Sequence, residues 1–193
     1  ILLFAFVKAP RVYQFARTAL AGTTLLALVG FAAYTLMPPR LLDDASEYGA
    51  CAGLEPGCHG YGIVDTLDVW GGIWKFGDGG AAIVSNQYAA MPSLHFGWSM
   101  WCAVTALLVL RALNRSTDVA KRHWWVFLYP AATLFCILVT GNHYWLDAFF
   151  GAVALGGGWL IALGIDRWIL SRTGAPASQP YDSGPDLAEA ART

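Results

Sequence analysis

The sequence GNHYWLDAFFGAVALGGGWLIALGI, residues 141–165, decides the class of fold to which this chain belongs. From residue 145 onward it is almost entirely apolar, and a helix of about 20 such residues crosses a lipid bilayer. His143 and Asp147 lie at its start and would share one face of a helix, because they are four positions apart. The carboxylate can then hold one ring nitrogen of the histidine and make the other a better base or nucleophile.

The composition of the chain is that of a membrane protein. Of its 193 residues, 56% are hydrophobic and only 13% are charged. Besides residues 145–165, three further stretches are predicted to be membrane spans: 18–37, 92–113 and the shorter 124–140. We therefore expect an all-α fold, a polytopic transmembrane helix bundle formed by one domain over residues 1–172.

The two ends of the chain and the small residues of the last span give further predictions. The opening residues ILLFAFV are typical of a further helix, and the small residues of 151–158 favour close helix packing. Residues 173–193 are rich in Pro, Ser, Ala and Asp and are expected to form a disordered cytoplasmic tail.

The distribution of basic residues predicts the orientation of the spans. Of the 12 Lys and Arg residues, only Arg40 and Lys75 fall in the long loop 38–90, which is rich in acidic residues. Because Lys and Arg collect in cytoplasmic loops, this loop should be extracytoplasmic. We expect an integral protein of a bacterial plasma membrane whose active site faces the extracytoplasmic side. No basic run is dense enough to indicate binding of nucleic acid.

The long loop contains two features of its own. Cys51 and Cys58 are predicted to form a disulfide in an oxidising compartment, with a metal site that includes His59 as the alternative. Residues 63–76 have apolar positions close to helical spacing and predict an amphipathic helix at the interface. This helix either caps the site or simply anchors the loop through its aromatic residues.

Five polar residues should meet at the outer ends of the spans: Arg40, Ser93, His95, His143 and Asp147. An arginine fork, a hydroxyl group and the free amides of a helix start would bind a tetrahedral oxyanion. One histidine, held by the carboxylate, would attack the oxyanion, and the other would protonate the leaving oxygen. The pattern indicates phosphoryl transfer through a phosphohistidine, which requires neither metal nor cofactor.

Other interpretations of these residues stay open at this point. His143 and Asp147 could form a structural pair, Ser93 could cap a helix, and Arg40 could anchor a span at the lipid headgroups. A transporter that relays protons or ions through its His and Asp residues is a further alternative. It predicts polar residues throughout the membrane depth, whereas these spans are apolar between their ends.

Three motifs resemble those of a known family. They are MPPR at residues 37–40, AMPSLH at 90–95 and GNHYWLD at 141–147. Together they are similar to the motifs of the PAP2 superfamily, the membrane type 2 phosphatidic acid phosphatases, and most closely to its branch related to inositol phosphorylceramide synthases. The resemblance covers roughly residues 34–158 and implies a PAP2-like helical core with an extracytoplasmic cap.

The resemblance also implies roles for the five converging residues. His143 would be the phosphate-accepting nucleophile, Asp147 would orient it, and His95 would be the general acid. Ser93 and Arg40 would bind the phosphate group.

Three positions depart from the family pattern. Ala33 stands where the first motif usually has a lysine, and Cys136 and Ile137 stand where the third usually has Ser-Arg. The candidates to supply the missing phosphate donors are Asn142, Thr140, Gln87 and Lys75.

We expect a metal-independent lipid phosphatase acting on a phospholipid or polyprenyl (di)phosphate. The alternative is a phosphotransferase that moves a phospho-headgroup to an alcohol acceptor. The expected partners are the lipid substrate and the membrane, and self-association into a homo-oligomer is left open.

Overall fold

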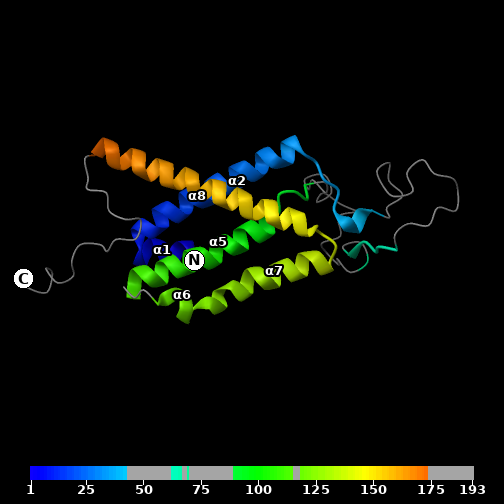
Figure 1. Ribbon diagram of the computed structural model, residues 1–193, viewed down its shortest axis with the longest axis horizontal. Coiled ribbons are helices and arrows are strands. Elements are labelled where there is room, and N and C mark those ends of the chain that lie inside the picture. The colour runs from blue at the N-terminus through cyan, green and yellow to red at the C-terminus, as the bar shows by residue number, and fades with distance from the viewer. Residues whose placement is uncertain (43–61, 67–68, 70–88, 115–117, 174–193) are drawn as a thin grey trace, which may run out of the picture.

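The computed structural model describes residues 1–42, 62–66, 69, 89–114 and 118–173, and the regular elements named in these ranges are all helices. In chain order they are α1 (Leu2–Lys8), α2 (Pro10–Ala33), η1 (Pro39–Leu41), α5 (Leu94–Asn114), α6 (Val119–Arg122), η3 (Trp124–Phe127), α7 (Leu128–Val139) and α8 (Trp145–Thr173). Figure 1 shows α2, α5, α7 and α8 extending in roughly the same direction. The expected all-α helix bundle is confirmed.

Three of the helices, α2, α5 and α8, are long and apolar enough to cross a membrane. The fourth apolar helix, Trp124–Val139, comprises η3 and α7 and is shorter. Many large apolar side chains on these helices are exposed in the isolated chain, as they are where lipid is the solvent. The opening stretch is helical as α1, in agreement with the prediction from its sequence.

Both ends of α2 and the start of α5 differ from the sequence prediction. Helix α2 begins at Pro10 and ends at Ala33, so it is shifted toward the N-terminus relative to the predicted span 18–37. It stops before the prolines: the backbone is already extended at Tyr34, and Leu36 forms an isolated β-bridge with Ala89. Helix α5 begins at Leu94, so Pro92 precedes its first turn instead of lying within it.

Glycines allow α8 to approach both α2 and α5 closely. A Cβ atom on Gly158 would collide with backbone and side-chain atoms of α2, and a Cβ on Gly22 would lie 3.1 Å from Gly158 Cα. At the other crossing, a Cβ on Gly151 would collide with the carbonyl oxygen of Ser93, and one on Gly97 would lie 3.2 Å from Gly151 O. These contacts confirm the close packing predicted for residues 151–158.

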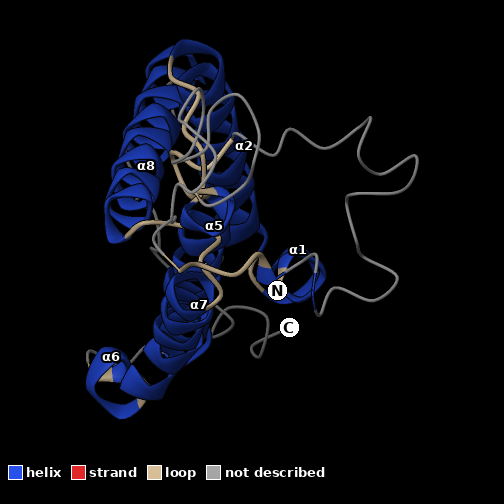
Figure 2. Cartoon of the chain, turned by 90° about the vertical axis from the view of Figure 1, so that its right-hand side faces the viewer, coloured by secondary structure: helices blue, strands red, loops and turns tan. Residues whose placement is uncertain are grey.

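Helix α5 occupies the middle of the bundle. It lies between α7 on one side and the paired α2 and α8 on the other, as both Figure 1 and the rotated view in Figure 2 show. The starts of α5 and α8 and the end of α7 therefore lie at the same end of the bundle. Both histidine motifs are located there.

Candidate active site

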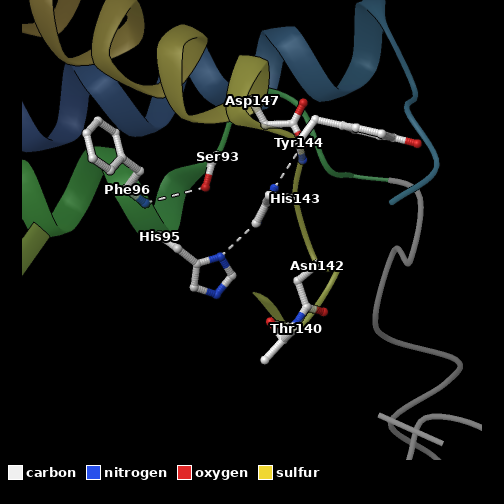
Figure 3. A network of polar contacts seen from close by, with 8 residues as sticks. All are labelled: Ser93, His95, Phe96, Thr140, Asn142, His143, Tyr144 and Asp147. Carbon is white, nitrogen blue, oxygen red and sulfur yellow. Dashed lines mark hydrogen bonds and ion pairs between the residues drawn. The ribbon is translucent and has the colours of Figure 1, made fainter. Parts of the chain in front are cut away.

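Three side chains form a chain of polar contacts at this end of the bundle (Figure 3). Nδ1 of His143 lies 3.3 Å from Oδ2 of Asp147, and Nε2 of the same ring lies 3.1 Å from Nδ1 of His95. His143 precedes α8, Asp147 lies in the first turn of α8, and His95 lies in the first turn of α5. Asp147 is fully buried, His143 is 6% exposed, and His95 is exposed.

The partners of each ring nitrogen determine where its proton lies. An ionised carboxylate can only accept hydrogen bonds, so Nδ1 of His143 carries the proton that faces Asp147. In the neutral tautomer that carries this proton, Nε2 has a lone pair, which can accept a hydrogen bond from Nδ1 of His95 in the contact between the two rings. The network thus places a hydrogen-bond acceptor, a potential nucleophile and a proton donor in sequence, which is the order that acid-base and nucleophilic catalysis require.

The carboxylate of Asp147 is fixed by the backbone around it. Its Oδ2 also accepts a hydrogen bond from the backbone N–H of Tyr144 at 2.8 Å. Figure 3 shows the Tyr144 ring directed away from His143. Burial and, second, the charge of Asp147 raise the pKa of the Tyr144 hydroxyl above its usual value, so this phenol stays protonated.

Ser93 connects the two motifs through its backbone. Its N–H donates to the backbone carbonyl of Asp147 at 2.8 Å, and its Oγ lies 3.4 Å from the N–H of Phe96. The second contact is a weak cap of α5, which corresponds to the alternative interpretation of this serine. Ser93 is fully buried beside Asp147.

Arg40 joins the site from the short helix η1. Its backbone N–H donates to the carbonyl of Gly141 at 2.8 Å, and Gly141 has a φ of +65°. The Arg40 side chain is 5% exposed, and its Nη1 contacts both carboxylate oxygens of Asp65 at 2.9 and 2.8 Å. Asp65 was not singled out from the sequence, where the only signal was an acidic residue in the predicted interfacial helix.

Of the remaining predicted residues, the structure describes Asn142 and Thr140. Asn142 donates from Nδ2 to Oγ1 of Thr140 at 2.7 Å, so its amide is used within the turn before His143. Lys75, Gln87, Cys51 and Cys58 lie outside the described residues. Within the part of the chain that the structure describes, no three His, Cys, Asp or Glu side chains are grouped to hold a metal ion.

The departures from the family motifs have visible structural roles. The carbonyl of Ile137 accepts the backbone N–H groups of both Asn142 and His143 at 3.1 Å, and the residue is buried. The carbonyl of Cys136 accepts the hydroxyl of Thr140 at 2.7 Å. These positions shape the turn that carries His143, but they contribute no cation to the site.

The fold and the contacts define an integral membrane protein with a histidine and aspartate site at one end of its helices. A family profile described as the PAP2 superfamily matches residues 1–161, and the chain belongs to this superfamily. No curated protein and no solved structure matches the chain. PAP2 proteins are generally phosphatases, and membership suggests a phosphatase or phosphotransferase that acts on lipid substrates.

Proposed function

We propose that this protein is a lipid phosphatase that forms a phosphohistidine at Nε2 of His143. The observation that supports it most directly is the pair of contacts on the His143 ring. A buried carboxylate holds Nδ1, and a second histidine lies 3.1 Å from Nε2. This arrangement orients the lone pair of Nε2 and places a proton donor beside the atom where bond exchange would occur.

The reaction would proceed in two displacements. In the first, Nε2 of His143 attacks the phosphorus atom, the bond from phosphorus to the lipid oxygen breaks, and His95 gives its proton to that oxygen. In the second, His95 removes a proton from water, the water oxygen bonds to phosphorus, and the bond to Nε2 breaks. The direct contact between the two rings must open to admit phosphate, which the exposed position of His95 permits.

Arg40 and Ser93 would bind the phosphate oxygens in this proposal, with Asn142 and Lys75 as further donors. The proximity of Arg40 to Gly141, two residues before His143, supports its part in the site. A lipid is the expected substrate because the surrounding surface is apolar. A pocket of about 340 Å³ between α2 and α8, which includes Met91, Pro92 and Phe150 in its lining, would accommodate hydrocarbon.

The second candidate is transfer of the phosphoryl or phospho-headgroup to an alcohol. Hydrolysis and transfer share the first displacement and differ only in whether water or an alcohol attacks the phosphohistidine. The absence of cations at Ala33, Cys136 and Ile137 supports it. These departures agree with the resemblance to the branch related to inositol phosphorylceramide synthases. We place the site on the extracytoplasmic side because the basic residues collect at the other end of the spans.

A substrate panel tests this function. The purified protein is incubated in EDTA with phosphatidic acid, a polyprenyl diphosphate or phosphatidylinositol, each with and without alcohol acceptors. Release of phosphate without an acceptor indicates a phosphatase, and an acceptor-dependent lipid product indicates a transferase. Activity should be lost in His143→Ala and should fall about 10³-fold or more in Asp147→Asn, which removes the charge that fixes the ring. Undiminished turnover in both His143→Ala and His95→Ala would overturn the mechanism.

A further inference from the structure

The ion pair between Arg40 and Asp65 has a one-sided geometry. Both oxygens of Asp65 contact the same guanidinium nitrogen, Nη1. A guanidinium has five N–H donors in a rigid plane, and the hydrogens of Nε and Nη2 lie along another edge of that plane. The carboxylate therefore holds one corner of the arginine and leaves the edge formed by Nε and Nη2 clear of its own oxygens.

This second edge contains a buried donor. Nε of Arg40 is buried and has no hydrogen-bond partner among the residues that the structure describes. A buried donor without an acceptor costs free energy and is rare in native proteins. The edge formed by Nε and Nη2 is one with which arginine binds two oxygens of a phosphate at once. An arginine that receives an oxyanion would present such an edge.

Arg40 and Asp65 are anchored to the same turn, the one that leads into His143. The backbone N–H of Arg40 donates to the carbonyl of Gly141, and Oγ1 of Thr66, next to Asp65, donates to the carbonyl of Thr140 at 2.7 Å. These two carbonyls belong to consecutive residues. The orientation of the guanidinium is therefore set relative to the backbone that carries the His143 ring.

We propose that Asp65 is a positioning residue for phosphoryl transfer: it holds Nη1 of Arg40 so that the Nε and Nη2 edge receives the phosphate of the lipid. This inference rests on the proposed function. A carboxylate beside an anion site repels a bound anion, so Asp65 favours phosphate binding through the orientation of Arg40 and not through its own attraction for the phosphate. Its charge also compensates that of Arg40, which is costly to bury without a partner.

The variants Asp65→Asn and Asp65→Glu test this role, with Asp118→Asn as a matched control at the opposite end of α5. Kinetics use the lipid of the panel that is turned over best, and calorimetry measures binding of orthovanadate as a tetrahedral oxyanion. In Asp65→Asn we expect KM and the orthovanadate Kd to rise about tenfold, from the loss of one charge-assisted hydrogen bond. We expect kcat to stay within about threefold, because the His95 and His143 contacts are intact.

Two further comparisons separate positioning from a merely structural role. Asp65→Glu keeps the charge and should recover part of the lost affinity. In an Arg40→Ala background, Asp65→Asn should have no further effect on KM, because Asp65 acts only through Arg40. Thermal unfolding in detergent is measured for each variant. Should Asp65→Asn not fold, Asp65→Glu still tests the role, because its longer side chain shifts the guanidinium and must raise KM while kcat is kept.

Tighter orthovanadate binding in Asp65→Asn would show that the carboxylate competes with the anion, and it would overturn the inference. Unchanged KM and Kd, or an equal effect in the Arg40→Ala background, would overturn it too. If any of these results is found while turnover still depends on His143, only the role of Asp65 is contradicted and the proposed function is not. A wild-type protein without turnover that depends on His143 would instead overturn the proposed function itself.

Discussion

At the scale of single residues, the site depends on one imidazole ring that is held at both nitrogens. Asp147 contacts Nδ1 of His143, and His95 contacts Nε2. The spacing of four residues predicted the first contact, although His143 lies just before α8 and not within it. The prediction succeeded because a residue in the turn before a helix can still reach a side chain in its first turn.

The partner of Arg40 could not be predicted in this way. Asp65 follows Arg40 by 25 positions, and the two meet only because η1 and the segment of Thr66 both bind the turn before His143. No local periodicity relates two such segments. Sequence patterns identify the residues of a motif, but they do not identify partners that are brought in by long-range backbone contacts.

Gly141 gives a prediction at this scale. Its φ of +65° disfavours other residues, and a Cβ there would lie 3.3 Å from the backbone nitrogen of Arg40. We expect Gly141→Ala to lower the free energy of unfolding by about 1–2 kcal/mol and to raise KM, because Arg40 is displaced. Thermal unfolding and steady-state kinetics in detergent measure both effects.

The control is Gly156→Ala in α8, where an added Cβ meets no atom within 4 Å. That substitution should leave KM unchanged and should not destabilise the protein, since alanine favours helix. A Gly141→Ala variant that behaves like Gly156→Ala would contradict the role given to this turn.

At the scale of elements, long apolar runs predicted the three helices that are long enough to cross a membrane, α2, α5 and α8, and the shorter apolar helix Trp124–Val139. They could do so because a helix in lipid must be apolar over its length. Their ends were predicted less well. Helix α5 starts at Leu94, directly after Ser93, whose backbone N–H donates to the carbonyl of Asp147. Helix α2 ends three residues before Leu36, which forms a β-bridge with Ala89. Both are contacts between distant segments, which hydropathy does not detect.

The crossing of α5 and α8 gives the prediction at this scale. A methyl group on Gly151 would collide with the carbonyl of Ser93, so Gly151→Ala must separate the two helices just below the histidines. We expect a loss of about 1–3 kcal/mol in unfolding free energy together with a lower kcat. Thermal unfolding and kcat for the folded fraction provide the measurement.

Gly158→Ala is the matched variant at the crossing of α2 and α8, seven residues further along the same helix. It should reduce thermal stability and keep the kcat of the folded protein, because Ser93 and Asp147 are not displaced. Equal effects of the two variants on kcat would show that the Gly151 crossing has no special part in aligning the site.

At the scale of the whole molecule, the proposed orientation has the histidine end of the bundle outside the cytoplasm. Val64 is exposed and precedes Asp65, which contacts Arg40 at that end. Ala120 is exposed on α6, which Figure 1 shows at the other end. In a chain whose four native cysteines are replaced, Val64→Cys should react with a membrane-impermeant maleimide in intact cells. Ala120→Cys should react only after the membrane is permeabilised. Labelling of Ala120→Cys in intact cells would contradict the proposed orientation.

The central claim is that phosphate is transferred to His143 before it is transferred to water or an alcohol. The most direct test uses a lipid phosphorothioate that is made chiral at phosphorus by oxygen isotopes. The configuration at phosphorus is compared between this substrate and the product. Each in-line displacement inverts the configuration, so two displacements through Nε2 of His143 predict overall retention. Overall inversion would show a single direct displacement and would contradict the account.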